Sequence, residues 1–256
     1  MKKIVLLVFL VSTYTFANAP FWGKTGHRVV GEVASQYIKN STKRKIEKIL
    51  NGASLADVAT YADDIKSDKR FRKYSPWHYV DFPFGKNYGD EQPSNKGDLA
   101  QGIKKCVEVL KDKNASQEDK AFYLKMLIHF VGDLHQPLHV GLEEDMGGNK
   151  IQVQWFGHSS NLHRVWDSDM IDDYKMSYSE LAVNLPTLSK EQVKTIQEGT
   201  YIDWIAESHK LAEKVEATAK TGDKLSYEYM YDNFGTVKMQ LEKGGIRLAK
   251  MLDEIF

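Results

Sequence analysis

The hydrophobic and polar positions of this chain alternate mostly with the period of an α-helix. Apolar residues recur at helical spacing in Ile46–Leu50, in Leu99–Leu110 and from Tyr227 to about Leu252. Residues suited to cap helix N-termini precede several helical segments. They are Ser41 and Thr42, Ser54 ahead of a segment ending at Asp64, Ser116 with Asp119, and Ser189 with Gln192 ahead of a long segment towards Leu211.

Two stretches break the helical pattern. Residues 77–89 are rich in proline, glycine and aromatic side chains, which predicts a loop. Gly147, Gly148 and Asn149 are followed by alternating apolar residues up to Trp155, which predicts a turn that enters a short strand. No internal repeat, low-complexity tract or linker interrupts the chain. The pattern predicts one all-α domain, a helical bundle with a small β-hairpin.

The N-terminus has the pattern of an export signal. Lys2 and Lys3 precede an unbroken apolar run, residues 4–11, and Ala17-Asn18-Ala19 gives the small-x-small pattern of a cleavage site. The run is too short to span a bilayer, and no later stretch is long and apolar enough. A buried N-terminal helix is the weaker interpretation. Residues 1–19 are therefore predicted to be a signal peptide, and 20–256 a secreted or periplasmic domain without a membrane anchor.

Charge and cysteine content narrow the class of protein. The chain has 35 basic and 35 acidic residues, so removal of two lysines with the signal leaves 33 − 35 = −2 over 237 residues (256 − 19). This balance of charges argues against a protein that binds duplex DNA through a broad basic surface. It allows an enzyme that binds phosphates through metal ions. The one cysteine, Cys106, excludes an internal disulfide and lies in an amphipathic pattern, as a core residue would.

The segment from His129 to His139 carries the strongest chemical signal. Every residue from Ala121 to Ile128 is apolar or aromatic except Lys125, so this helix should be buried. Burying His129 and Asp133 one turn apart is costly unless something pairs with them, and a metal ion would do so. For these two residues alone, a hydrogen-bonded His–Asp pair is an equal alternative. Three histidines and an aspartate within eleven residues favour metal, and Pro137 should end the helix and return His139 to the same site.

Four further segments carry similar residues. His163 and Asp167 again stand one turn apart. The other three segments, taken alone, would be interpreted as solvated helix faces or as packing. Six of the eight histidines fall in these five segments, and only His158 and His209 lie outside. A mixed set of imidazoles and carboxylates suits catalytic zinc. The other segments are Tyr61–Lys66, Trp77–Asp81 and Phe21–His27.

With these segments, the chain resembles the zinc-dependent single-strand nucleases of the S1/P1 type, which share an all-α fold with zinc-dependent bacterial phospholipases C. The resemblance covers essentially the whole mature chain and rests on the order and spacing of the motifs. They are Trp-x-x-x-x-His, Ala-Asp, Trp-His-Tyr, His-x-x-x-Asp-x-His-Gln-Pro-x-His and His-x-x-x-Asp.

The resemblance implies three zinc ions and a set of site residues. The first ion would be held by Asp63, His78, His129 and Asp133, and the second by His139, His163 and Asp167. The third would take His27, a shared oxygen of Asp133, and the free amine and carbonyl of an N-terminal Trp22. Asp63 and Lys66 would be catalytic, with Lys66 stabilising charge on the phosphate. The nucleobase would bind at Tyr79, Asp81, Gly147 and Asn149. His135 lies within the motif but is not a ligand in the family, so we expect it to orient a ligand.

The mechanism that the resemblance implies follows from zinc chemistry. Bound zinc lowers the pKa of water to ~7, so a hydroxide is available to attack phosphorus in line. The products would be 5′-phosphorylated nucleotides from single-stranded DNA or RNA, because a stacked and paired base cannot enter the pocket. The protein is expected to be a monomer. The sequence leaves open the preference between DNA and RNA and any 3′-nucleotidase activity.

Two features depart from the family. Fungal and plant relatives carry disulfides, which this chain cannot form. Cleavage after Ala19 would leave Pro20 and Phe21 ahead of Trp22, so cleavage up to residue 21, or further trimming, is needed to expose Trp22. Two alternatives remain: a phospholipase C-like phosphodiesterase on the same scaffold, and a non-catalytic zinc-binding protein.

Overall fold

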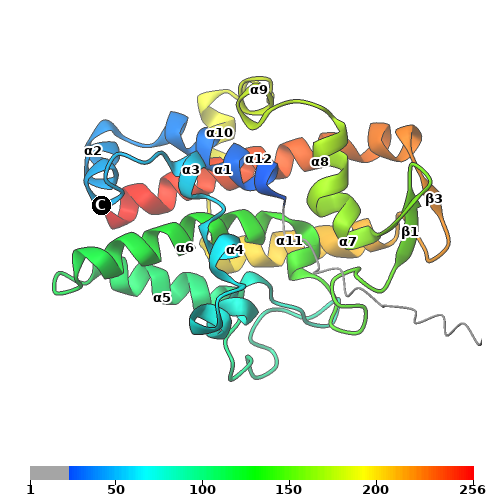
Figure 1. Ribbon diagram of the computed structural model, residues 1–256, viewed down its shortest axis with the longest axis horizontal. Coiled ribbons are helices and arrows are strands. Elements are labelled where there is room, and N and C mark those ends of the chain that lie inside the picture. Colours follow the sequence, from blue (N-terminus) through cyan, green and yellow to red (C-terminus); the bar gives the residue numbers. More distant parts are fainter. Residues whose placement is uncertain (1–22) are drawn as a thin grey trace, which may run out of the picture.

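The computed structural model of the chain describes residues 23–256, so the predicted signal peptide and Trp22 lie outside the described residues. The predicted all-α class is confirmed (Figure 1). The longer helices are α1 (Lys24–Tyr37), α2 (Asn40–Ile49), α5 (Leu99–Lys111), α6 (Gln117–His135), α11 (Tyr201–Glu216) and α12 (Tyr227–Ile255). The shorter ones are α3 (Leu55–Val58), α4 (Tyr61–Ile65), α7 (Leu162–Arg164), α8 (Met170–Asp173), α9 (Tyr178–Val183) and α10 (Lys190–Ile196). Two 3₁₀ segments, η1 (Lys69–His78) and η2 (Pro137–Val140), and one π-helical turn, η3 (Val165–Asp169), complete the helical elements.

Helix α6 lies at the centre of the bundle. Helices α5 and α12 pack directly against it, and α1 packs mainly against α12 and also contacts α6 (Figure 1). Neighbouring elements bury the C-terminal half of α6 on all of its faces. The apolar residues before His129 predicted this burial. Gly31 and Gly245 allow the helices to approach closely: an added Cβ would lie 2.7 Å from Ala56 N and 2.4 Å from Val33 Cβ, respectively.

The predicted hairpin is present as part of a small sheet. Strands β1 (Gln152–Trp155) and β2 (His158–Asn161) pair antiparallel, with Trp155 opposite His158. A third strand, β3 (Lys224–Leu225), pairs parallel with β1 and gives the order β2-β1-β3. The sequence did not predict β3, because two residues are too few to show a period.

Three helix boundaries differ from the prediction. The expected helix from Ser54 to Asp64 is two helices, α3, which Ser54 does cap, and α4. Ser41 and Thr42 lie inside α2 and do not cap it. The long segment after the capping box of Ser189 and Gln192 divides into α10 and α11. The division falls near Gly199, whose φ of +77° is incompatible with a continuing α-helix.

Other sequence predictions concern the core and the surface. Cys106 is fully buried, which confirms its packing role, and burial raises the pKa of its thiol. The predicted loop at residues 77–89 begins inside η1, because Trp77 and His78 are the last two residues of that helix.

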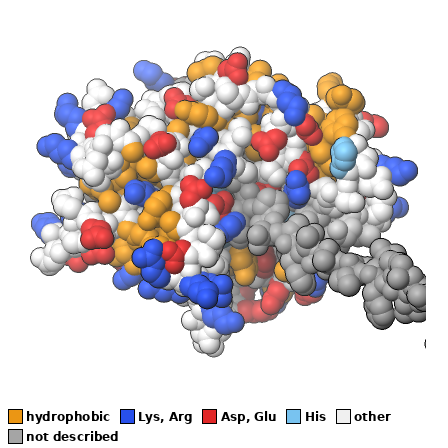
Figure 2. Space-filling view, in the orientation of Figure 1, with side chains coloured by type: hydrophobic (Ala, Val, Ile, Leu, Met, Phe, Trp, Pro, Cys, Tyr) orange, Lys and Arg blue, Asp and Glu red, His pale blue; other side chains and the backbone are white. Residues whose placement is uncertain are grey.

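On the face of the molecule shown in Figure 2, basic and acidic side chains are interspersed. Among the described helices, none has the length and apolar content needed to cross a membrane.

Glu242 of α12 gives a test of the packing between α12 and α1. Its side chain is 2% exposed, and Oε2 finds no hydrogen-bond partner among the described residues. Burial raises its pKa to about 7, so stability should be greatest below its unfolded pKa near 4.5 and fall as the pH rises through 7. The loss is at most ~1.4 kcal/mol per pH unit.

Glu242→Gln should therefore raise the melting temperature relative to the unchanged protein, by a margin that grows between pH 5 and pH 8. Thermal unfolding with zinc in constant excess measures this margin. A margin that does not change with pH would show that the Glu242 carboxyl ionises without cost in the folded protein.

Candidate metal centre

Imidazoles and carboxylates from six elements and the helix α6 meet near the middle of the bundle. Three groups have ligand atoms that all lie within 4.8 Å of one another, close enough to hold a metal ion. The groups are His27, His129 and Asp133; Asp63, His78 and His129; and His139, His163 and Asp167. The structure thus brings together every predicted His and Asp ligand, from segments up to 140 residues apart (167 − 27). The predicted ligand Trp22 lies outside the described residues.

Asp133 is at the centre of the arrangement. It is fully buried on α6, one turn after His129, and His129 Nε2 lies 3.3 Å from Asp133 Oδ2. His27 Nε2 lies 3.4 Å from Asp133 Oδ1, and His139 Nδ1 lies 3.2 Å from the same oxygen. The two oxygens of one carboxylate therefore face different groups of histidines, as a bridging ligand would.

His27 reaches this centre because α6 has a glycine where α1 crosses it. The His27 ring stacks on the His129 ring, with the centroids 3.8 Å apart. A Cβ on Gly132 would lie 2.6 Å from His27 Nδ1, too close for any real side-chain carbon. Gly132 therefore makes room for His27 beside Asp133.

Asp63 and His78 complete the second group from the other side of α6. His78, the last residue of η1, places Nδ1 3.0 Å from Asp133 Oδ2 and 3.1 Å from His129 Nε2. Asp63 of α4 places Oδ1 3.8 Å from His129 Nε2. Both histidine nitrogens lie beyond hydrogen-bond distance of this carboxylate, His129 Nε2 at 3.8 Å and His78 Nδ1 at 3.9 Å, so an ion could lie between them and Asp63.

The third group depends on the irregular segments. Gln136 and Pro137 end α6, and η2 turns His139 back towards Asp133, as predicted. His139 Nε2 lies 3.3 Å from Asp167 Oδ1, and the His139 and His163 rings stack with centroids 5.0 Å apart. Asp167 sits in the π-helical turn η3, an irregularity that is frequent at functional sites.

Backbone carbonyls fix the tautomers of three histidines. Nδ1 of His129 donates to Ala59 O at 2.8 Å, and Nδ1 of His163 donates to Gly147 O at 2.7 Å. Nδ1 of His139 donates to His78 O at 2.9 Å. A neutral ring that donates from Nδ1 carries its lone pair on Nε2, so these hydrogen bonds leave Nε2 of each ring available as a ligand atom, as is usual in metal sites.

The electrostatics of the cluster are extreme because the groups are buried together. Burial opposes ionisation of Asp133, but the neighbouring histidines outweigh it and hold its pKa well below 3.8. Burial raises the pKa of Asp167 to about 7 and lowers that of His163 to about 3. For His139, Asp133 outweighs burial and raises the pKa to about 10. Without a metal ion, this buried cluster holds protons on some of its imidazoles and carboxyls and negative charge on others. A divalent cation could replace the protons.

The donor set fits zinc. Imidazole nitrogens and carboxylate oxygens are zinc ligands, and the described residues offer no thiolate here, since Cys106 is in the core. Asp133 Oδ1 and Asp167 Oδ2 are buried and accept no hydrogen bond from the described residues. Buried carboxylate oxygens without donors are costly, and a metal ion would satisfy them.

The other predicted site residues lie around this centre. Lys66 Nζ is 3.2 Å from Asp63 Oδ1, and its side chain is 31% exposed, so it stands between the cluster and solvent. Tyr79 follows His78, and 44% of its surface is exposed. Asp81 accepts a hydrogen bond from Gly141 N at 3.2 Å, and burial raises its pKa to about 7.

Two residues predicted for the nucleobase pocket have other contacts. Gly147 is buried with φ +57°, and a Cβ there would lie 2.1 Å from Leu138 O, so its place in the structure requires glycine. Through its carbonyl it supports His163. Asn149 donates from Nδ2 to Met146 O at 2.8 Å, within the same loop.

His135 points away from the centre. Its Nδ1 donates to Val131 O, and its Nε2 accepts from Arg247 Nη1 at 3.1 Å. Neither hydrogen bond reaches a predicted ligand. Burial and the Arg247 charge lower the His135 pKa to about 3, so the neutral ring ties α6 to α12.

Sequence reasoning missed several residues that support the centre. Ala59, where the helix predicted from Ser54 breaks, gives its carbonyl to His129. Gln136 is buried, accepts from Leu138 N with Oε1, and donates to Asp167 Oδ1 at 3.4 Å. His209 donates to Val140 O and stacks on Phe82, with ring centroids 3.7 Å apart. The Gln-Pro pair after the buried helix was the one local signal available for these contacts.

Comparison with known proteins gives consistent results. A family model described as S1/P1 Nuclease matches residues 22–256. Endonuclease 4 of Arabidopsis thaliana is 31% identical over 286 residues, which cover 96% of this chain and 93% of that protein. Nuclease P1 of Penicillium citrinum is 29% identical, covering 91% of this chain and 97% of that protein. Nuclease S1 of Aspergillus oryzae is 32% identical, covering 77% and 70%.

Proposed function

The chain belongs to the S1/P1 nuclease family, and we propose that it is a zinc-dependent endonuclease that hydrolyses single-stranded DNA and RNA to 5′-phosphorylated products. Membership makes it a nuclease, a hydrolase that acts on phosphodiester bonds. The observation that carries the proposal is the meeting of three groups of His and Asp side chains around Asp133.

Zinc, in three ions, is the proposed cofactor. Asp63, His78, His129 and Asp133 would hold one ion, and His139, His163 and Asp167 a second. His27 and Asp133, with the amine and carbonyl of an N-terminal Trp22, would hold the third. When bound, zinc would lower the pKa of water towards ~7 and draw negative charge from the phosphate oxygens.

The residues of the chain would position the substrate and keep the ions in place. Lys66, held by Asp63 at the solvent edge of the centre, would bind a phosphate oxygen and stabilise charge on it. Tyr79 would stack on the nucleobase next to the cleaved bond. Asp133 would keep both of its oxygens directed at ions, because three histidines favour its ionised form.

A metal analysis combined with a digestion assay tests the proposal. Purified protein should contain zinc and release 5′-phosphorylated products from single-stranded DNA and RNA faster than from duplex DNA. Phosphatidylcholine serves as the comparison substrate, because a phospholipase C-like enzyme on this scaffold would hydrolyse it instead. Bound zinc without cleavage of any phosphodiester would favour a non-catalytic zinc-binding protein.

The N-terminus of the exported protein tests the third ion. Signal cleavage, with any later trimming, should leave Trp22 as the first residue, since its free amine is the proposed ligand. N-terminal sequencing of the secreted or periplasmic protein identifies this residue. A longer or blocked N-terminus together with full activity would exclude Trp22 as a required ligand.

Tyr79→Ala should weaken substrate binding and spare the metal. Base–aromatic stacking contributes about 1–3 kcal/mol per base, so KM should rise about tenfold, with kcat within about threefold and zinc content unchanged. Steady-state kinetics on a single-stranded oligonucleotide gives both constants.

Tyr231→Ala is the matched control, because Tyr231 is 89% exposed on α12 and does not line the surface cavity to which Tyr79 contributes. It should leave KM unchanged. An unchanged KM in Tyr79→Ala as well would remove Tyr79 from the nucleobase site.

A further inference from the structure

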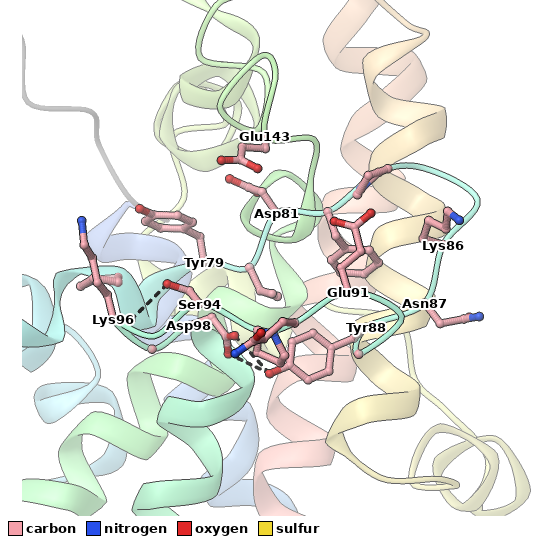
Figure 3. Close-up of a pocket in the computed structure, with 18 residues that line it drawn as sticks. Tyr79, Asp81, Lys86, Asn87, Tyr88, Glu91, Ser94, Lys96, Asp98 and Glu143 are labelled. Atoms are coloured by element: carbon pink, nitrogen blue, oxygen red, sulfur yellow. Dashed lines mark hydrogen bonds between the residues drawn. The ribbon is translucent and has the colours of Figure 1, made fainter.

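A cavity of about 550 Å³ is lined by Tyr79, the residue that follows the proposed ligand His78 (Figure 3). One wall is the segment from Tyr79 to Pro83, and the other is formed by residues 86–98. Val80 N donates to His139 O, and Phe82 N donates to Gly141 O, so this wall is fixed to the segment that carries a metal ligand. The size suits a nucleoside, and the position suits the base next to a phosphate held at the centre.

Aromatic rings line the cavity. Tyr79 presents a half-exposed ring, and Tyr88 is held by hydrogen bonds from its hydroxyl to both oxygens of Asp98, at 3.2 and 3.1 Å. Phe82 packs edge-on against Tyr88, with ring centroids 6.4 Å apart. Such rings stack with any base, so they provide affinity without discrimination.

Discrimination must come from the polar groups, which comprise the acidic side chains Asp81, Glu91, Asp98 and Glu143, two lysines, and the uncharged Asn87, Gln92 and Ser94. Figure 3 shows the carboxyl groups of Asp81 and Glu143 directed towards each other next to the Tyr79 ring. Burial, and then the charges of Asp81 and Glu143, raise the pKa of the Tyr79 hydroxyl. Lys86 and Lys96 lie at opposite ends of the cavity. The edge of a base stacked on Tyr79 would therefore face hydrogen-bond acceptors.

We propose that Glu143, acting with Asp81, makes this cavity selective for guanine and disfavours uracil and thymine. The inference rests on the proposed nuclease function and names the base that its pocket accepts best. Guanine offers adjacent N–H donors at N1 and N2, which two carboxylates can accept. Uracil and thymine offer one N–H between two carbonyl oxygens, and those oxygens would face the carboxylates without a donor.

The test uses dinucleoside monophosphates that differ in one base. The series GpA, ApA, CpA and UpA varies one position, and ApG, ApC and ApU vary the other. The assay is run at pH 8, above the pKa of about 7 of Asp81, with the zinc-loaded enzyme. At one of the two positions, kcat/KM for guanine should exceed that for uracil by about tenfold or more.

Glu143→Gln should reduce this ratio to about threefold or less, mainly by raising KM for guanine substrates, because the amide can present a donor where the carboxylate accepted. Glu143 is exposed, so the variant should fold and keep its zinc. Glu144→Gln is the matched control: Glu144 is adjacent and exposed, does not line the cavity, and contacts Lys150 through its backbone carbonyl at 2.7 Å. It should retain the full ratio.

Equal rates for guanine and uracil at both positions, or an unchanged ratio in Glu143→Gln, would overturn the inference and leave the nuclease function intact. Cleavage of none of these substrates or of longer single strands by zinc-loaded enzyme would instead defeat the proposed function, and the inference with it.

Discussion

Asp133→Ala is expected to lose bound zinc and nuclease activity together. The Asp133 carboxylate lies 3.0–3.4 Å from nitrogens of four histidines, and its two oxygens face different groups. Alanine would remove a ligand shared by two proposed ions and leave the histidines without their central negative charge. Because metal ions contribute several kcal/mol to the transition state, activity should fall at least about a thousandfold.

Metal analysis by mass spectrometry and single-strand digestion measure the two effects on one preparation. Asp232→Ala is the control, since Asp232 is an exposed aspartate on α12 outside all three groups, and it should change neither quantity. A folded Asp133→Ala protein with full zinc content and intact activity would contradict the assignment of Asp133.

Gly132→Ala is expected to displace His27 and reduce the metal content by about one ion per chain. The new Cβ would lie 2.6 Å from His27 Nδ1. The His27 ring is also stacked on the His129 ring, so it cannot move towards His129 to avoid the new Cβ. His27 would move away from Asp133 Oδ1, which it now approaches at 3.4 Å. A misplaced ligand should lower kcat/KM about 10–100-fold, the range seen when the groups that orient ligands are changed.

Gly235→Ala is the matched control for the effect of a glycine-to-alanine change in a helix. Gly235 lies within α12, and nothing lies within 4 Å of an added Cβ. It should be neutral or slightly stabilising, because alanine favours helix. If Gly132→Ala keeps full zinc content and kcat/KM, the close approach of α1 to α6 does not position His27.

The helices and the His/Asp ligands could be predicted from the sequence because both depend on local spacing. His129 and Asp133 share a face of α6 at a separation of four residues, and the apolar residues before them require burial. The π-helical turn that holds Asp167 also preserves this spacing closely enough for the prediction to succeed.

The supporting contacts could not be predicted, because they depend on how distant elements meet. The break between α3 and α4 frees the Ala59 carbonyl for His129, 70 residues away, and nothing in the local pattern marks it. Gly132 looks like a neutral helix residue until α1 crosses it, and His135 turns to Arg247 of α12 although it stands between two predicted ligands. Glu143 lies in a loop without periodicity.

Anomalous X-ray scattering at the zinc edge, from crystals of the exported protein, tests the central claim most directly. We predict three peaks, about 2.0–2.2 Å from the ligand atoms. One should lie among Asp63, His78 and His129, one among His139, His163 and Asp167, and one beside His27 and the shared Asp133. A map from zinc-supplemented crystals with no peak at these groups, or with zinc bound only elsewhere, would contradict the account.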